Sequence, residues 1–488
     1  MSATVAAPAS AKYEMVVGLE VHVQLRTRTK LFCNCSTQFG DPPNRNTCPV
    51  CLALPGSLPV VNESAVELAT RAALALGAEV HEESIFARKN YFYPDLPKGY
   101  QISQFDKPLA TDGGLVIGER PDGAPLRIGI TRVHMEEDAG KSIHDRFSGA
   151  SAIDLNRAGV PLIEIVSEPD IRSSAEAGSY LRLLKQVLEY VDVSDLNMEE
   201  GSLRVDANIS IRERGAAKLG TKTEVKNMNS FSGVERALEA EFARQVAIVD
   251  GRGTVEQETL LWDADRGTVR PARSKEGSHD YRYFPDPDLP PLRLTNEWIA
   301  RIRDRLPELP DARRRRFAEE YHLGAYDIDV LTASPRVADY FESVARAHGD
   351  AKTAANWVMG EVLAVLKNTG APIQQFQVRP ADLATLLDMV RAGAVSNTAA
   401  KRIFALMVQT GDRPEQIAER EGLAQVGDET QLASWVDEVL STQAAEWQRY
   451  LAGEKKLLGV FVGAVMKKSG GRADPRKVNQ LLAARASG

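Results

Sequence analysis

The alternation of apolar and polar residues is sharpest in residues 18–25, where every second residue is apolar and the residues between them are Glu20, His22 and Gln24. Side chains of a β-strand point alternately to the two faces of its sheet. The segment therefore predicts a strand with one face in the core and another that presents a carboxylate, an imidazole and an amide.

A second segment, residues 203–211, repeats this pattern with Arg204, Asp206 and Asn208 between apolar residues. Half-exposed antiparallel strands always have a polar outer face, and this ordinary explanation stays open. Ordinary outer faces favour Thr, Lys, Ser and Glu, however. Arginine, aspartate and asparagine together favour a functional face.

A third segment, residues 127–141, holds two adjacent glutamates, Glu136 and Glu137. A bulge or turn near Gly140 would bring both of them into use. An extended backbone would place these residues on the side opposite Glu137: Arg132, His134, Glu136 and Asp138. Carboxylates with imidazoles and amides are ligands for a divalent metal, and arginine binds phosphate, so the three segments predict a site for Mg²⁺ and nucleotide phosphates.

Helical periodicity and turn residues divide the chain into three predicted domains. Residues 1–294 mix strands with helices that follow Asn62, Ser173 and Ser230, and Ser232 and Glu235 have capping-box spacing. Residues 295–412 and 413–488 carry helical spacing with few strand signals. The predicted fold class is an α+β domain with an antiparallel sheet, followed by an all-α domain and a small α-helical tail domain.

All four cysteines lie in one stretch, as Cys33, Cys35, Cys48 and Cys51. The C-x-C and C-P-V-C spacing suits two knuckles that close a tetrahedral zinc site without an open position, which predicts a structural role. Two disulfides or four ordinary thiols are the alternatives. We see no secretion signal, so we expect a reducing compartment, which favours zinc.

Composition describes an ordinary globular protein with a formal net charge of -7, which argues against indiscriminate coating of nucleic acid. No apolar run approaches the roughly 20 residues of a membrane span, and residues 1–12 resemble neither a leader nor an anchor. We expect a cytoplasmic protein with a short disordered N-terminal tail. The four arginines at 313–316 precede Glu319 and Glu320, which predicts a solvated, salt-bridged helix face.

Three further segments combine basic, amide and aromatic residues. Residues 86–105 are predicted to form a loop that holds Lys89 among tyrosine and phenylalanine rings, which could stack on bases. Residues 221–230 place Lys226 before a helix start, where free N–H groups could bind an anion. A third segment contributes His279, Asp280, Arg282 and two tyrosines. The string D-A-G-K-S lacks the first glycine of a P-loop, so ATP would need an uncommon fold.

The end of the chain is basic. From Glu446 onward basic residues exceed acidic ones by six in an otherwise acidic protein. This favours contact with RNA, although a solvated helical surface is the plain alternative. The basic residues are Arg449, Lys455, Lys456, Lys467, Lys468, Arg472, Arg476, Lys477 and Arg485.

Several longer motifs together resemble the B subunit of the aspartyl/glutamyl-tRNA amidotransferase. They are G-L-E-V-H-V-Q-L, R-K-N-Y-F-Y-P-D-L-P-K-G-Y-Q-I-S-Q-F, H-M-E-E-D-A-G-K, D-L-N-R-A-G-V-P-L-I-E-I-V-S-E-P-D, M-E-E-G-S-L-R-V-D-A-N-I-S and D-Y-R-Y-F-P-D-P-D. The resemblance extends from Tyr13 to the end. It implies an N-terminal cradle domain, a helical domain and a tail domain that contacts tRNA.

The resemblance also implies an activity and its partners. The chain would use ATP and Mg²⁺ to phosphorylate the side-chain carboxylate of Glu-tRNA(Gln) or Asp-tRNA(Asn). Ammonia released from glutamine by the A subunit, a glutaminase, would then displace the phosphate, and the small C subunit would complete a heterotrimeric amidotransferase. By resemblance, Glu20, His22 and Glu137 are the expected magnesium ligands.

Other residues have less direct roles by the same resemblance. Glu136 would lie close to the metal, and these residues would grip nucleotide or acyl phosphate: Arg204, Asp206, Asn208, Lys89 and Lys226. Two rival hypotheses are a non-catalytic tRNA-binding scaffold, which has no need for Glu20, His22 and Glu137, and an ATP-dependent small-molecule ligase, which has no need for a basic tail.

Overall fold

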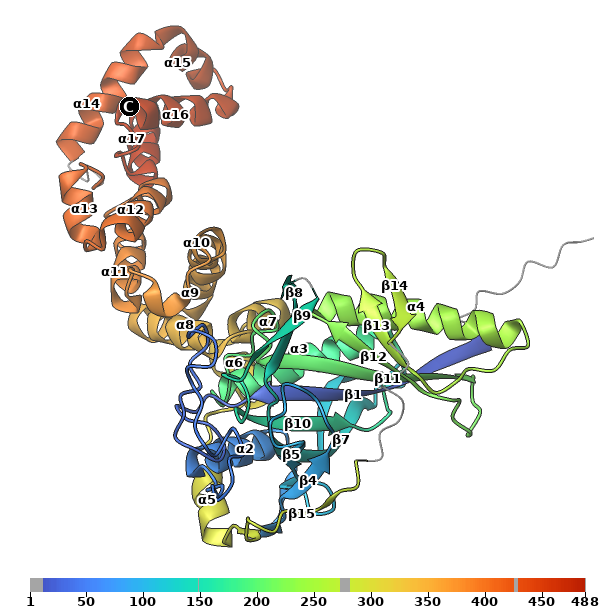
Figure 1. Cartoon of the computed structure of the whole chain (residues 1–488). Coiled ribbons are helices and arrows are strands. Elements are labelled where there is room, and N and C mark those ends of the chain that lie inside the picture. The colour runs from blue at the N-terminus through green and yellow to red at the C-terminus, as the bar shows by residue number, and fades with distance from the viewer. Residues whose placement is uncertain (1–11, 148, 273–280, 425–428, 488) are drawn as a thin grey trace, which may run out of the picture. The chain divides into compact units, whose positions relative to one another are not determined.

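The chain divides after Pro310 into two units, each with its own hydrophobic core (Figure 1). The computed structural model describes residues 12–147, 149–272, 281–424 and 429–487. Residues 1–11 of the predicted N-terminal tail lie outside this range.

The first unit is built on a nine-stranded sheet with the order β14-β13-β12-β11-β1-β10-β7-β6-β2. Neighbouring strands are antiparallel except β12 and β13, which are parallel. The strands are β1 (Tyr13–Gln24), β2 (Glu79–Val80), β6 (Ala110–Glu119), β7 (Pro125–Glu137), β10 (Pro161–Ser167), β11 (Leu203–Glu213), β12 (Thr223–Met228), β13 (Thr259–Asp263) and β14 (Thr268–Pro271). The predicted antiparallel sheet is confirmed.

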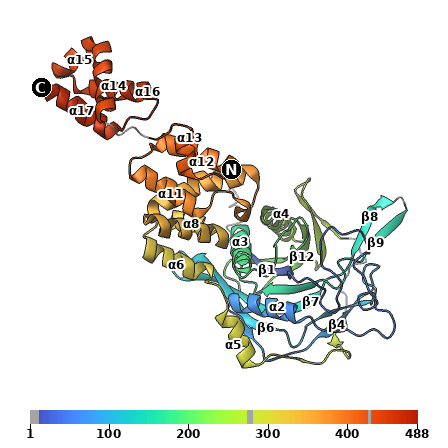
Figure 2. The same cartoon turned by 90° about the vertical axis from the view of Figure 1, so that its left-hand side faces the viewer.

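The three alternating segments become β1, β7 and β11, which lie near the middle of this sheet. The apolar residues Leu19, Val21 and Val23 of β1 are almost fully buried. They share one core with α2 (Glu63–Ala75), α3 (Ser174–Tyr190) and α4 (Phe231–Asp250), which pack on one face of the sheet (Figures 1 and 2). The polar residues of the strands therefore point to the face without these helices.

The three helices begin where the sequence predicts, because a side chain caps each one. The side chains of Asn62, Ser173 and Ser230 accept a hydrogen bond from a backbone N–H of the first turn. The predicted capping box at Ser232 and Glu235 is wrong. Ser230 takes the cap, and Glu235 instead forms an ion pair with Arg182 at 3.0 Å.

Small sheets adjoin the large one. β4 (Ala87–Asn90) and β5 (Tyr100–Ser103) pair with each other, so the two ends of the predicted loop at residues 86–105 are strands. A loop remains between them, where two prolines interrupt the strand pattern. The other short strands are β3 (Glu83–Ser84), β8 (Lys141–Phe147), β9 (Ala150–Asp154), β15 (Phe284–Pro285) and β16 (Leu292–Arg293).

The first unit extends past the boundary predicted at residue 294. Helix α5 (Asn296–Asp304) contacts α2, and its buried Ile299 belongs to the core of the first unit. Periodicity identifies a helix, but it does not reveal which core the apolar face joins.

The second unit is helical, as predicted, and Figure 2 shows it in colours that run from yellow through orange to red. Its helices are α6 (Pro310–Tyr321), α7 (Ala325–Thr332), α8 (Pro335–His348), α9 (Ala351–Trp357), α10 (Leu363–Thr369), α11 (Pro380–Arg391), α12 (Asn397–Thr410), α13 (Pro414–Arg420), α14 (Glu429–Thr442), α15 (Ala444–Leu451), α16 (Leu458–Lys468) and α17 (Pro475–Ser487). One π-helical turn, Val358–Val362, joins α9 to α10, and two 3₁₀ turns occupy Ile373–Gln375 and Lys455–Leu457.

The boundary predicted at residue 412 falls before α13, whose Ile417 and Ala418 belong to the core formed by α6 to α12. A separate small core begins at Leu432 and includes residues of α14, α16 and α17. The helices of the tail therefore start at α14.

The arginine run at 313–316 is salt-bridged, as predicted, but its principal partner is on another helix. Glu342 of α8 accepts hydrogen bonds from Arg313 and Arg316, and Arg313 itself is buried. Its guanidinium is covered by packing between helices, which the composition of one helix cannot reveal. Among the helices of the described residues, none combines the length and apolar character of a transmembrane span.

Candidate active site and metal centre

Strand register places the polar residues of neighbouring strands in rows across the sheet. His22 lies opposite Arg204 of β11 on one side and Glu164 of β10 on the other. Glu164 in turn lies opposite His134 of β7. Glu20 and Asp206 begin a second row. The faces predicted separately from the sequence therefore join into one polar surface.

One group on this surface, formed by His22, Glu136 and Glu164, has a ligand atom from each residue within 4.8 Å of the others. Glu164 lies 3.3 Å from His22 and 3.4 Å from His134. Oε2 of Glu136 is buried and has no hydrogen-bond partner among the described residues, although the ammonium of Lys89 is 3.5 Å away. A nitrogen and two carboxylates with an unsatisfied oxygen fit a divalent cation.

The electrostatics of this group depend on burial and on the pairing of opposite charges. Burial acts to raise the pKa of Glu164, but His134 and His22 outweigh it and hold the pKa well below its usual value. Burial acts to lower the pKa of His22 and of Lys89, yet the nearby carboxylates raise both. The ionised Glu164 is therefore available to a cation.

A second group, formed by Glu20, Asp206 and Glu224, also has ligand atoms within 4.8 Å of one another. It already contains a cation, because the ammonium of Lys226 is 3.2 Å from Asp206 and 3.1 Å from Glu224. Asn208 donates to Glu20 at 3.0 Å. Burial raises the pKa of Glu20, and the charges of the neighbouring carboxylates add to this effect.

Asp138 holds the side chain of Arg204 in place on the polar surface. Its buried carboxylate accepts hydrogen bonds from Arg204 at 3.1 Å and from Gln24 at 2.7 Å. Burial alone would raise the pKa of Asp138, but the charges of Arg204 and Arg157 outweigh it and lower the pKa. An ionised partner fixes the guanidinium in one orientation, as a phosphate-binding arginine requires.

Glu137 lies apart from both groups. Its carboxylate accepts hydrogen bonds from the side chain of Lys98 and from the backbone N–H of Ile102. It lines a cavity of about 100 Å³ together with Lys30 and Cys51. The strand alternation predicts Glu137 on the opposite side from Glu136, and the structure keeps it there without the bulge that would have joined them. The expected set of Glu20, His22 and Glu137 is therefore not brought together.

Two carboxylates of the site, Glu164 and Glu224, were missed by sequence reasoning. Glu164 lies in the otherwise apolar segment P-L-I-E-I-V-S, and a lone carboxylate in a buried strand is costly unless it is paired. That signal could have identified it. Glu224 lies within the segment that supplied Lys226, and nothing in its local pattern distinguishes it from a surface residue.

Aromatic rings surround Lys89 at the edge of the polar surface. Its ammonium lies 5.3 Å from the ring centre of Tyr281, which also packs edge-on against Tyr91 and Tyr283. The fold therefore brings Lys89 together with the tyrosine rings of two separate segments, as the mixture of basic and aromatic residues predicted. His279 and Asp280 lie outside the described residues.

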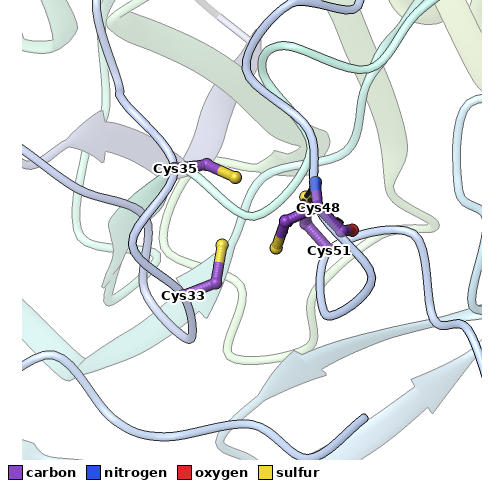
Figure 3. Close-up of side chains that lie close together, drawn as sticks. All are labelled: Cys33, Cys35, Cys48 and Cys51. Carbon is purple, nitrogen blue, oxygen red and sulfur yellow. Dashed lines mark hydrogen bonds between the residues drawn. The ribbon is translucent and has the colours of Figure 1, made fainter.

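The four cysteines form one group, drawn in Figure 3. Their sulfur atoms lie within 4.8 Å of one another, and those of Cys48 and Cys51 are 3.9 Å apart. A tetrahedral site with Zn–S bonds of about 2.3 Å separates its sulfurs by about 3.8 Å. All four are free cysteines, so the disulfide alternative does not describe this structure.

Hydrogen bonding among the sulfurs favours charge on one of them. A hydrogen bond from Cys33 lowers the pKa of Cys51 to about 4, and the nearby ammonium of Lys30 contributes. The same hydrogen bond raises the pKa of Cys33, and burial raises the pKa of Cys35 to about 11. These shifts favour the thiolate form at Cys51, which is the form that binds a metal.

The basic residues of the tail divide into paired and unpaired ones. Arg449, Lys468 and Arg485 form ion pairs with acidic residues of the tail itself. Four exposed residues have neither an ion pair nor an aromatic contact within the described part of the chain: Lys455, Lys456, Lys467 and Arg476. Arg472 is also exposed and without an ion pair there, but its guanidinium lies over the ring of Trp435. These four are the candidates for contact with phosphate.

Comparison with known families identifies the class first. Residues 15–300 match a family described as the GatB/GatE catalytic domain, and residues 339–485 match a family described as the GatB domain. The polar surface and the cysteine group both belong to the part that matches a catalytic domain.

Curated relatives narrow this class to one family. The B subunit of aspartyl/glutamyl-tRNA(Asn/Gln) amidotransferase from Chlorobium limicola is 54% identical over 98% of this chain and 100% of its own. Its counterparts from Chlorobium phaeobacteroides and Carboxydothermus hydrogenoformans are 52% and 51% identical over 98% and 96% of this chain, and 100% and 98% of their own. This chain belongs to the family of B subunits of aspartyl/glutamyl-tRNA(Asn/Gln) amidotransferase.

Proposed function

We propose that this chain, within a glutamine-dependent amidotransferase, uses ATP to activate the side-chain carboxylate of Glu-tRNA(Gln), Asp-tRNA(Asn) or both. Family membership gives the reaction class, and one observation carries the location. The buried, unsatisfied Glu136 lies with His22 and Glu164 on the face of the sheet opposite α2, α3 and α4, which also carries Arg204 held by Asp138.

The reaction has two steps, a phosphoryl transfer and a displacement of the phosphate by ammonia. In the first, a side-chain oxygen of the aminoacyl group bonds to the γ-phosphorus of ATP as the bond from that phosphorus to the ADP oxygen breaks. In the second, ammonia bonds to the acyl carbon, the bond to the phosphate oxygen breaks, and the nitrogen loses a proton. A carboxylate is a poor electrophile, and the acyl phosphate overcomes this while water is excluded.

Mg²⁺ fits the group of His22, Glu136 and Glu164, with Glu136 as a direct ligand and Glu137 outside the set. When bound there, Mg²⁺ would neutralise charge on the phosphate oxygens. Glu164 holds His22 in orientation through their 3.3 Å contact. Glu20 belongs to the second acidic group, where Lys226 supplies the positive charge.

The cations around this group have distinct roles in the proposal. Arg204, which Asp138 orients, and Lys89 bind phosphate oxygens and stabilise the charge that is transferred. Asp206 positions Lys226, and Asn208 positions Glu20. The nucleophile and the leaving group come from the substrates, so no side chain needs to form a covalent bond.

Two partner proteins complete the enzyme. The glutaminase releases ammonia from glutamine, and the small third protein completes a heterotrimer. The exposed lysines of the tail contact the tRNA backbone, and zinc in the cysteine group braces the loop at residues 33–51, which has little apolar content of its own.

The test supplies ATP, Mg²⁺, ammonium and Glu-tRNA(Gln) to the complex with His22→Ala or Glu136→Gln. Ammonium removes any dependence on the glutaminase. We expect amide formation to fall at least about a hundredfold, more than the loss of an outer partner of a metal site causes. The matched control, Glu137→Gln, should retain far more activity. Normal amidation by both site variants would refute the location, and normal amidation by a mixture of the two partner proteins without this chain would refute the activity.

A further inference from the structure

Lys30 is a fully buried lysine beside the cysteine group. Its side chain has 0% exposure and pairs with no carboxylate in the part of the chain that the structure describes. The ammonium donates to the backbone oxygens of Asn46 at 2.7 Å and Leu155 at 3.2 Å. It also lies 3.7 Å from the sulfur of Cys51.

A buried ammonium is costly even when its hydrogen bonds are made. Two carbonyls satisfy two of its three donors, but neutral carbonyls do not cancel a charge. Buried charges in proteins are normally paired or bound to metals. The environment of Lys30 therefore requires a negative charge, and the sulfur of Cys51 is the ionisable atom that the ammonium contacts.

The cysteine group supplies this charge once it holds its metal. Four thiolates around Zn²⁺ carry a net charge of about -2, since a coordinating thiol is deprotonated. We propose that Lys30 is the counter-charge of the metal-thiolate site, so that metal binding and the burial of this lysine stabilise each other. The inference rests on zinc occupancy, which belongs to the proposed function.

Lys30 also connects the cysteine loop to the sheet. Its backbone N–H donates to the carbonyl of Cys35 at 3.0 Å, and that of Leu31 donates to Gly159 at 2.8 Å. The N–H of Gly159 donates to the carbonyl of Asp138, also at 2.8 Å. Lys30 thus contacts both halves of the cysteine loop and the turn at residues 155–159, which is hydrogen-bonded to Asp138. Its charge balance decides whether the loop stays fixed to the sheet.

The experiment measures the zinc affinity of the full chain by competition with a chelator. Lys30→Met removes the charge and the donors, whereas Lys30→Gln removes the charge and keeps an amide donor. We expect both to bind zinc about 10 to 100 times more weakly, the range for lost partners of metal ligands. Lys107→Met is the control, because Lys107 is half-exposed and paired with Glu83 away from the cysteines.

Unfolding by urea, with and without zinc, separates a charge effect from a packing effect. We expect both Lys30 variants to be destabilised relative to the parent chain with zinc, and much less or not at all without it. Equal destabilisation in both conditions, or parent-like zinc affinity in Lys30→Gln, would overturn the counter-charge role. A parent chain that binds no zinc would instead overturn the zinc proposal itself.

Discussion

Both units bury a glutamate among cations, but they complete its environment differently. In the second unit, Glu342 accepts from Arg316, Arg346 and Tyr321 on one oxygen and from Arg313 and Arg316 on the other. In the first unit, Glu136 has one oxygen without a hydrogen bond in the described residues, and the ammonium of Lys89 is 3.5 Å from it.

This contrast separates a structural cluster from a binding site. A saturated carboxylate has no lone pair left for a ligand, so the cluster of Glu342 serves the packing of helices α6 and α8. An unsatisfied carboxylate at 3% exposure is costly and persists where a ligand completes it. The same residue types therefore have different meanings in the two units.

The largest effect should come from Glu164→Gln. The amide keeps the shape of the side chain but removes the negative charge that His22 and His134 contact, so the ligand group loses a charge and a partner that orients His22. We expect kcat for ammonium-dependent amidation to fall by about a hundredfold or more. Steady-state rates of the complex would measure this, and Glu342→Gln should leave the rate unchanged. A small loss in Glu164→Gln would end the distinction between the two clusters.

Glu342→Ala should lower the stability of the second unit and not the rate of amidation. Removal of the carboxylate leaves three arginines facing one another, which should lower the free energy of unfolding of the second unit by about 3 kcal/mol. Chemical denaturation followed by the circular dichroism of the chain would measure it. The first unit should unfold as in the parent. An unchanged transition would mean that the arginines find other partners.

Neutralisation of the unpaired tail lysines should weaken tRNA binding. With Lys455, Lys456 and Lys467 replaced by alanine, the slope of log affinity against log salt should become shallower by about three, roughly one per phosphate contact. Filter binding at several salt concentrations measures the slope. The control replaces the three paired residues Arg449, Lys468 and Arg485, and its slope should change less. Equal slopes in the two triple variants would contradict a role for the unpaired lysines.

The smallest expected effect is on how the stability of the second unit depends on pH. Burial acts to raise the pKa of Glu342, but hydrogen bonds from Arg316 and Arg313 lower it from its usual 4.5 to about 2. A lowered pKa in the folded state stabilises the second unit above pH 4.5, and this contribution is lost as pH falls from 4.5 towards 2. Urea titrations across this range should show the loss, and Glu342→Gln should remove this component.

Sequence patterns predicted the sheet well because burial enforces a period of two. The polar faces of β1 and β11 were predicted from alternation alone. Alternation also indicated opposite sides for Glu136 and Glu137, but a bulge that would join them stayed open and the expected magnesium set contained Glu137, which the structure keeps apart. The starts of the helices after Asn62, Ser173 and Ser230 were predicted from local signals, although the capping box expected at Ser232 and Glu235 did not form. These features depend on residues close together in the chain.

The features of the fold and the site that the sequence did not predict depend on contacts between segments that are distant in the chain. Strand order brings Glu164 beside His22 although 142 positions separate them, and no local pattern encodes that neighbour. The burial of Arg313 depends on α8, and the assignment of α5 to the first unit depends on α2. The contact of Lys30 with Cys51 also depends on the fold, which brings the cysteine loop and the turn at Leu155 together.

The most direct test of carboxylate activation at the group of His22, Glu136 and Glu164 follows oxygen atoms. Glu-tRNA(Gln) labelled with ¹⁸O in the side-chain carboxylate would be amidated by the complex with ATP, Mg²⁺ and ammonium. Mass spectrometry of the released phosphate would show whether one labelled oxygen has moved to it. We expect this transfer in the parent, and we expect Glu136→Gln to lose both the transfer and amide formation. Amide formation by the parent with unlabelled phosphate, or full transfer in Glu136→Gln, would contradict carboxylate activation at this group.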